Sequence, residues 1–80
     1  MKVWYIEEER RGFIGLASSY EKAVERLIKE DWLNEGTMDG RGCSIEYYFG
    51  ANWKKTVLEG LTVGDLEKFG FHLREVTVYD

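Results

Sequence analysis

An amphipathic stretch from residue 16 to residue 33 (LASSYEKAVERLIKEDWL) constrains the fold more than any other part of the chain. Ser18 and Glu21 match the S-x-x-E capping box, in which a serine hydroxyl and a glutamate carboxylate bind free backbone amides at a helix start. Charged side chains fill one side of the stretch, and the apolar stripe opposite them consists of Tyr20, Ala23, Val24, Leu27 and Ile28. The pattern predicts a long helix with one face on the core.

The segments before this helix are typical of β-strands. Residues 2–9 (KVWYIEEE) and 13–17 (FIGLA) are short and rich in β-branched and aromatic residues, and residues 10–12 (RRG) fit a hairpin loop between them. Both segments carry apolar side chains at consecutive positions and not only at alternate ones. We therefore expect them to be central in the sheet or covered on both faces.

The segments after the helix give weaker signals. Residues 34–42 hold three glycines and predict a flexible loop, with Gly36 as a candidate helix C-cap. Residues 43–49 (CSIEYYF) alternate between apolar and polar positions and predict a third strand. Residues 53–58 (WKKTVL) fit both a helix and a strand, and we favour the strand.

The C-terminal part of the chain predicts a short helix and a last strand. Thr62 and Asp65 form a cap for the helix, Gly70 ends it, and residues 71–79 are rich in strand formers. No internal repeat or linker divides the chain. We expect one α+β domain, residues 1–80, with a small antiparallel sheet of four to five strands, one long and one short helix, and the order ββαββαβ.

The charge of the chain argues against nucleic acid as a direct partner. Eleven Lys and Arg against fifteen Asp and Glu give a net charge of −4, which repels a phosphate backbone. Charged residues interrupt every apolar run well before the roughly 18 residues that a membrane span needs. The single cysteine, Cys43, excludes an internal disulfide framework, and no charged-then-apolar leader opens the sequence. We expect a cytoplasmic protein without a membrane partner.

Cys43 and His72 carry the catalytic or metal-binding chemistry that the sequence offers, because the chain has one cysteine and one histidine. A Cys–His dyad needs both side chains on one face of neighbouring strands, and no nucleophile signature surrounds Cys43. A tetrahedral zinc site commonly uses four Cys or His ligands, so carboxylates would have to complete it. We expect a non-enzymatic protein without a cofactor; an enzyme built on these two residues and a zinc-stabilised small binding domain are alternatives.

Acidic and aromatic side chains are the candidate binding residues. Two helices can cover only one face of the expected sheet, so some aromatic rings should be exposed, and Tyr and Trp anchors inside a charged rim are typical of protein interfaces. The predicted acidic rim is Glu7, Glu8, Glu9, Glu30, Asp31, Glu35 and Asp39, and the predicted anchors are Trp4, Tyr48 and Trp53. Such a surface fits a basic partner, and a homodimer could form through the same sheet.

Residues 2–6 (KVWYI), 12–28 (GFIGLASSYEKAVERLI) and 69–80 (FGFHLREVTVYD) resemble the small uncharacterised proteins carried by phages and prophages of Gram-positive bacteria. The G-x-x-S-S-x-E-K-A core is the recognisable part, and the likeness is best in the N-terminal part of the chain. The resemblance implies a strand hairpin that runs into a helix and a late strand that completes the sheet. It implies no catalytic residues.

Small acidic proteins of this kind include inhibitors of host defence, with anti-CRISPR proteins as the best-known group. The resemblance therefore implies a binding protein that acts in the host cytoplasm on a host protein, with a type II, Cas9-type CRISPR effector as a candidate target because its nucleic-acid channel is basic. The alternative from a different class is an oligomeric sponge for a small molecule or nucleotide, in which interface aromatics stack on a base.

Overall fold

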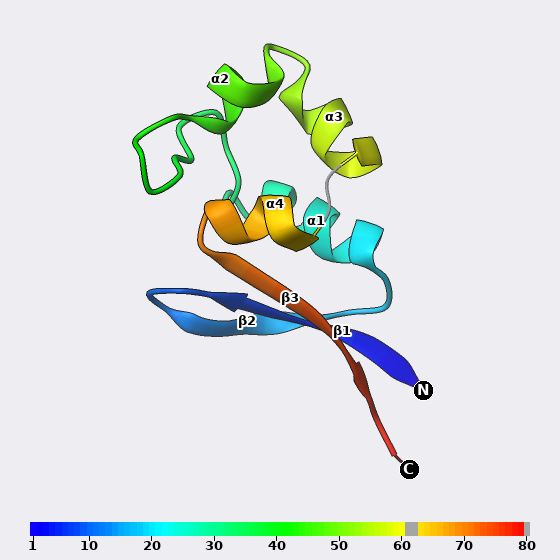
Figure 1. Cartoon of the computed structure of the whole chain (residues 1–80). Coiled ribbons are helices and arrows are strands. Elements are labelled where there is room, and N and C mark those ends of the chain that lie inside the picture. Colours follow the sequence, from blue (N-terminus) through cyan, green and yellow to red (C-terminus); the bar gives the residue numbers. More distant parts are fainter. Residues whose placement is uncertain (61–62, 80) are drawn as a thin grey trace.

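A computed structural model gives the structure of this chain and describes residues 1–60 and 63–79. In that part of the chain the elements are β1 (Lys2–Glu8), β2 (Gly12–Ala17), α1 (Tyr20–Lys29), α2 (Ile45–Phe49), α3 (Trp53–Gly60), α4 (Val63–Lys68) and β3 (Phe71–Thr77). The strands form one antiparallel sheet in the order β2-β1-β3, and the helices lie together on one of its faces (Figure 1). The other face, which we call the outer face, points away from the helices.

The predicted class α+β agrees with this architecture, but the predicted arrangement is wrong. The described residues form three strands and four short helices, whereas we expected four to five strands with one long and one short helix. The order is ββααααβ and not ββαββαβ. The difference arises between residues 43 and 60, where both predicted strands are helices.

Within the predicted strand 43–49, residues 45–49 form helix α2, and Ser44 acts as its N-cap. Its hydroxyl oxygen accepts a hydrogen bond from the Tyr47 amide at 3.1 Å, and Gly50 ends the turn with φ 79°. The alternation of apolar residues that suggested a strand covers only a few positions, too few to separate a period of 2 from a period of 3.6. Ile45 is the one residue of α2 that is fully buried.

Residues 53–58 form the first part of α3. Trp53 and Val57, four residues apart, are both buried on the side of α3 that faces the core. The strand propensity of Thr56 and its neighbours is overridden by this burial. The ambiguity between helix and strand is thus resolved in favour of the helix.

Helix α1 begins one residue later than expected and is shorter. Its N-cap is Ser19, whose hydroxyl oxygen accepts from the Lys22 amide at 3.1 Å, so Ser18 and Glu21 do not form the expected capping box. The helix ends after ten residues with Glu30 as C-cap, and Asp31 adopts φ 63°. Gly36 lies beyond this end and is therefore not the C-cap that we expected.

The other predicted boundaries are close to the observed ones. Strands β1 and β2 form the expected hairpin, β1 is central, and β2 is an edge strand whose outer face is uncovered by the described helices. Gly70, with φ 87°, follows α4 and leads into β3. The proposed cap residue Thr62 lies outside the described residues.

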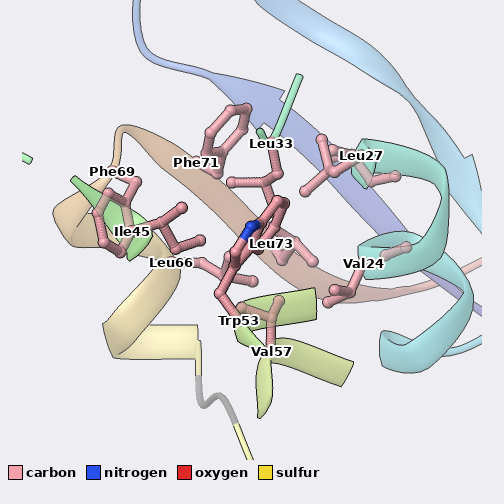
Figure 2. Packing of buried hydrophobic residues seen from close by; sticks show 12 residues of the cluster. Val24, Leu27, Leu33, Ile45, Trp53, Val57, Leu66, Phe69, Phe71 and Leu73 are labelled. Atoms are coloured by element: carbon pink, nitrogen blue, oxygen red, sulfur yellow. The ribbon is translucent and has the colours of Figure 1, made fainter. Parts of the chain in front are cut away.

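The core lies between the inner face of the sheet and the helices. Figure 2 shows side chains of all four helices and of β3 converging there. The buried residues are Ile6, Ala23, Val24, Leu27, Leu33, Ile45, Trp53, Val57, Leu66, Phe69, Phe71 and Leu73. Buried residues within the described part of the chain are all apolar, so packing rather than polar pairing holds the two layers together.

Candidate functional site

A groove of about 790 Å³ lies at the end of the molecule where the β1–β2 hairpin turns. Four segments line it: residues 8–11 of the hairpin, residues 30–32 after α1, residues 36–40 of the following loop, and residues 68–71 between α4 and β3. These segments lie at the left of Figure 1. The fold thus brings together residues that are up to 63 positions apart, since Glu8 and Phe71 both line the groove.

The groove gathers most of the predicted acidic rim. The carboxylates that line it are Glu8, Glu9, Glu30, Asp31 and Asp39, and its cationic side chains are Arg10, Arg11 and Lys68. Five negative and three positive charges give the lining a formal charge of −2. The groove is therefore acidic, but it is mixed in charge rather than uniformly negative.

Glu8 and Glu9 shape the hairpin side of the groove. The Glu8 carboxylate accepts hydrogen bonds from the amides of Arg10 and Arg11 at 3.0 and 2.8 Å, which fixes the turn. The Glu9 amide donates to the Gly70 carbonyl at 2.8 Å and ties the hairpin to the turn after α4. The hairpin side of the groove is thus held by local hydrogen bonds within the turn and by one long-range hydrogen bond to Gly70.

Asp39 organises the loop on the opposite side. One carboxylate oxygen accepts from the amides of Arg41 and Cys43 at 2.8 and 2.9 Å, and the other accepts from the Tyr48 hydroxyl at 2.5 Å. The hydrogen bond from Tyr48, followed by those from the backbone, lowers the pKa of Asp39 below its usual value of 3.8. The same bond raises the pKa of Tyr48 to about 12. At neutral pH the pair is a carboxylate with a protonated phenol.

Two cation–π contacts border the groove. Lys68 Nζ lies 5.2 Å from the centre of the Tyr48 ring, and that ring meets Phe69 edge-to-face at 6.0 Å. On the other side, Arg11 Cζ lies 5.5 Å from the centre of the Trp32 ring. Two of the three cations that line the groove, Arg11 and Lys68, are therefore held against aromatic rings.

The remaining predicted site residues lie elsewhere. Glu7 is on the outer face of the sheet, where it pairs with His72 across the strands, and Glu35 is exposed in a turn that does not line the groove. Trp4 packs on the core side against Tyr20 at 5.5 Å.

Of the three predicted anchors, Tyr48 alone has an exposed ring. Tyr48 is 39% exposed, whereas Trp53 is 4% exposed and belongs to the core, so its ring is not available to a partner.

Sequence reasoning missed the charged and aromatic lining residues Arg10, Arg11, Trp32 and Lys68. The two arginines follow directly on the Glu7–Glu9 run in the predicted hairpin loop, so their charge could have been counted with it. Lys68 gave no such signal, because only the chain reversal after α4 carries it to the groove.

Cys43 and His72 lie in different layers of the molecule. Cys43 precedes α2, and its amide donates to Asp39, whereas His72 sits on the outer face of β3 beside Glu7. Among residues 1–60 and 63–79, no group of three or more His, Cys, Asp or Glu side chains is arranged to hold a metal ion. Cys43 and His72 are therefore not placed together as a Cys–His dyad would require, and the described residues hold no cluster arranged as a zinc site.

Comparisons with protein-family models, with curated proteins and with solved structures find no match for this chain. The fold and the groove define its class as a small α+β domain with an acidic surface groove beside its hairpin. Among the described residues, every helix is too short or too polar to cross a membrane.

Proposed function

We propose that this chain is a non-enzymatic binding protein whose groove takes a basic segment of a host protein. One observation carries the proposal: five of the seven carboxylates that the sequence marks as a binding rim line a single groove. An acidic lining attracts Lys and Arg side chains and raises the rate of encounter with a basic surface.

The lining also suits the apolar stems of basic side chains. Trp32 and Met38 line the groove next to the carboxylates, and Met38 is 59% exposed. Lys and Arg pack their methylene chains on such surfaces while their charged ends reach the carboxylates. A basic peptide segment fits this combination better than a small anion, which the carboxylates would repel.

A type II CRISPR effector is our candidate target, on the strength of the resemblance to phage and prophage proteins. The guide–target channel of such effectors is positively charged and binds nucleic acid through its backbone. An acidic protein that occupies part of this channel excludes the nucleic acid by direct competition. The chain then acts as a stoichiometric inhibitor and needs no catalytic residues.

The test is an inhibition and binding assay with a purified effector of this type. We expect a stoichiometric complex that blocks cleavage of target DNA and weakens as salt rises. Glu9→Lys and Asp31→Asn change two carboxylates of the groove, and Asn still accepts the left-handed backbone at position 31. We expect each to weaken binding by about tenfold.

The matched control is Glu25→Lys, because Glu25 is exposed on α1 and does not line the groove. Affinity that is indifferent to salt and to the two groove variants would contradict the acidic groove as the binding site. Failure of the effector to bind, with a different basic host protein bound instead, would overturn the target but keep the groove.

A further inference from the structure

The groove beside the hairpin already holds an arginine of this chain on an aromatic ring. Arg11 extends from the turn between β1 and β2, and its Cζ lies 5.5 Å from the centre of the Trp32 ring, which follows α1. Both residues line the groove. The contact therefore lies inside the site that the proposed function assigns to a basic segment of the partner.

Trp32 is a fixed surface for a cation. Its amide donates to the Leu27 carbonyl at 2.8 Å, and the amide of Leu33 donates to the same carbonyl at 3.0 Å. The Trp32 side chain is partly buried and packs against the core. Because the backbone and the core hold the ring, little conformational freedom of the protein is lost when a cation binds it.

The Arg11 guanidinium is held less firmly than the ring. Arg11 is exposed, and in the described part of the chain its guanidinium has no ion pair and no hydrogen bond. Lys68, the other groove cation that contacts a ring, also lies 3.9 Å from a carboxylate oxygen of Asp65. An exposed cation–π contact by itself is weak, so a second cation can replace Arg11 on Trp32.

Two carboxylates of the groove lack a partner. Within residues 1–60 and 63–79, the carboxylates of Glu9 and Asp31 accept no hydrogen bond and form no ion pair. The other three acidic residues of the lining, Glu8, Glu30 and Asp39, each accept at least one hydrogen bond. The groove thus has two carboxylates that can accept hydrogen bonds from an incoming cation.

We infer that the groove binds an arginine of the partner segment on the Trp32 ring, and that Arg11 occupies this position in the unbound protein. The inference rests on the proposed function, because it names the side chain that the groove recognises and the residue that regulates its access. The incoming guanidinium replaces Arg11 on the ring and pairs with one of the two partnerless carboxylates, of which Asp31 directly precedes Trp32 in the chain.

Arginine suits this site better than lysine. A guanidinium is planar, so it stacks on an indole while its N–H groups donate to a carboxylate. An ammonium group is a compact and strongly hydrated charge without a flat face. We expect a segment with arginine to bind at least about threefold more tightly than the same segment with lysine.

Arg11 lowers the affinity of the groove in two ways. It competes for the ring, which reduces the fraction of molecules that are ready to bind, and its charge repels a basic segment. Arg10 provides a matched comparison, because it also lines the groove but contacts no ring among the residues that the structure describes. Replacement of either arginine removes one positive charge, so the difference between the two variants measures the competition for Trp32.

The test measures the affinity of two dye-labelled peptides of equal length, one of alternating arginine and glycine and one of alternating lysine and glycine, by fluorescence anisotropy. Arg11→Gln should bind the arginine peptide about two- to fivefold more tightly than Arg10→Gln does, which is the range of an exposed cation–π contact. Trp32→Leu keeps an apolar contact with the core and removes the aromatic face. In this background the two peptides should bind about equally, and the difference between the arginine variants should vanish.

Circular dichroism checks that Trp32→Leu is folded. The comparison between the two arginine variants does not depend on that variant, because Arg10 and Arg11 are both exposed. A preference for the arginine peptide together with the tighter binding of Arg11→Gln supports the inference.

The remaining outcomes separate this inference from the proposed function. Equal affinities of Arg11→Gln and Arg10→Gln for the arginine peptide, or equal affinities of the unmodified chain for both peptides, would overturn the inference. The groove would still be a site for a basic segment if both peptides bind and Glu9→Lys weakens them. If neither peptide binds to the unmodified chain or to Arg11→Gln at about 1 mM, the inference and the assignment of the groove both fail.

Discussion

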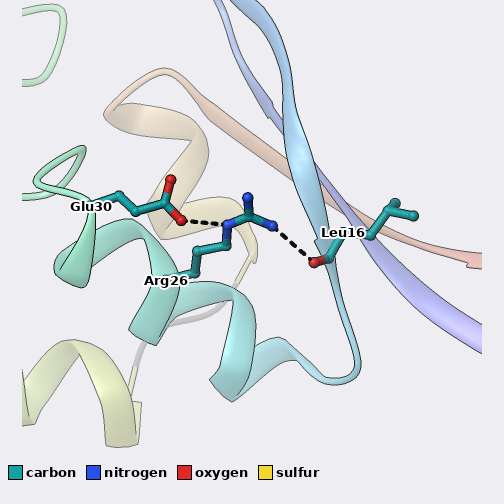
Figure 3. A network of polar contacts seen from close by, with 3 residues as sticks. All are labelled: Leu16, Arg26 and Glu30. Carbon is teal, nitrogen blue, oxygen red and sulfur yellow. Dashed lines mark hydrogen bonds and ion pairs between the residues drawn. The ribbon is translucent and has the colours of Figure 1, made fainter.

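The guanidinium of Arg26 lies against the backbone of Gly15, in the space that a Cβ there would occupy. From this position Arg26 donates a hydrogen bond to the Leu16 carbonyl at 3.2 Å and pairs with Glu30 at 2.6 Å (Figure 3). The contact joins α1 to the edge strand β2, and it satisfies a carbonyl that an edge strand would otherwise leave to solvent or to another chain. The absence of a side chain at Gly15 is what permits it.

Gly15→Ala should therefore destabilise the fold through Arg26. The new Cβ displaces the guanidinium, and the loss of its hydrogen bond to Leu16 should lower the free energy of unfolding by about 1 kcal/mol. Urea unfolding measures the change. The control is Gly40→Ala, where a Cβ meets nothing within 4 Å, so that the entropic effect of replacing glycine is common to both. Equal stability of the two variants would show that Arg26 moves aside without loss.

The start of α1 gives a second comparison between neighbouring residues. Ser19→Ala removes the hydroxyl that accepts from the Lys22 amide, and loss of such a cap costs about 1 kcal/mol of stability. Ser18→Ala should change the free energy of unfolding by less than about 0.5 kcal/mol, as expected of an exposed position without a special contact. Thermal or urea unfolding distinguishes the two variants. A larger loss of stability for Ser18→Ala than for Ser19→Ala would support the capping box expected from the sequence and contradict the observed cap.

These two serines illustrate how far the sequence predicts the fold. Helix α1 was predictable because its periodicity runs over many residues and serine marks its start. The hairpin and β3 were predictable because strand-forming residues fill them and glycine lies at the turns before β2 and β3. The cap of α1 was misplaced because two consecutive serines offer the same chemistry one residue apart. Helices α2 and α3 were missed because each is so short that burial of Ile45, Trp53 and Val57 decides its conformation.

The candidate site was predictable in composition but not in arrangement. Glu8, Glu9, Glu30 and Asp31 were found because acidic residues at the ends of predicted elements tend to be exposed. Their convergence in one groove depends on the chain reversals at residues 9–11 and 69–70, which bring distant segments together. Trp53 was misplaced as an anchor because residues 53–58 were predicted as a strand of a half-covered sheet, whereas they form part of α3 and the Trp53 ring packs in the core.

Replacement of the buried Trp53 should therefore lower the stability of the fold. Trp53→Ala removes a ring that is 4% exposed, and such truncations cost about 3 to 5 kcal/mol, which approaches the total stability of a small domain. Tyr47→Ala is the matched control, since Tyr47 is 76% exposed on α2 and should change the free energy of unfolding by about 0.5 kcal/mol or less. Similar unfolding curves for the two variants would place Trp53 at the surface.

The Asp39–Tyr48 hydrogen bond should give the protein a dependence on pH at both ends of the scale. The folded pKa of Tyr48 is raised from 10.0 to about 12, so its stabilising effect is complete below pH 10 and is lost as the pH rises toward 12. The folded pKa of Asp39 is lowered from 3.8, so its stabilising effect is present above that value and is lost as the pH falls through the lower folded pKa. Between these limits neither group makes the free energy of unfolding depend on pH.

Tyr48→Phe tests both windows, because it removes the hydroxyl and keeps the ring against Lys68 and Phe69. The difference between the ultraviolet titration curves of the unmodified chain and the variant should have its midpoint near 12 rather than 10. In acid the variant should lose stability at a higher pH, since the largest cause of the lowered pKa of Asp39 is gone while the amides of Arg41 and Cys43 still donate to the carboxylate. A difference midpoint near 10 would mean that the phenol does not donate to Asp39 in solution, and the loop that borders the groove would then be held by the backbone hydrogen bonds alone.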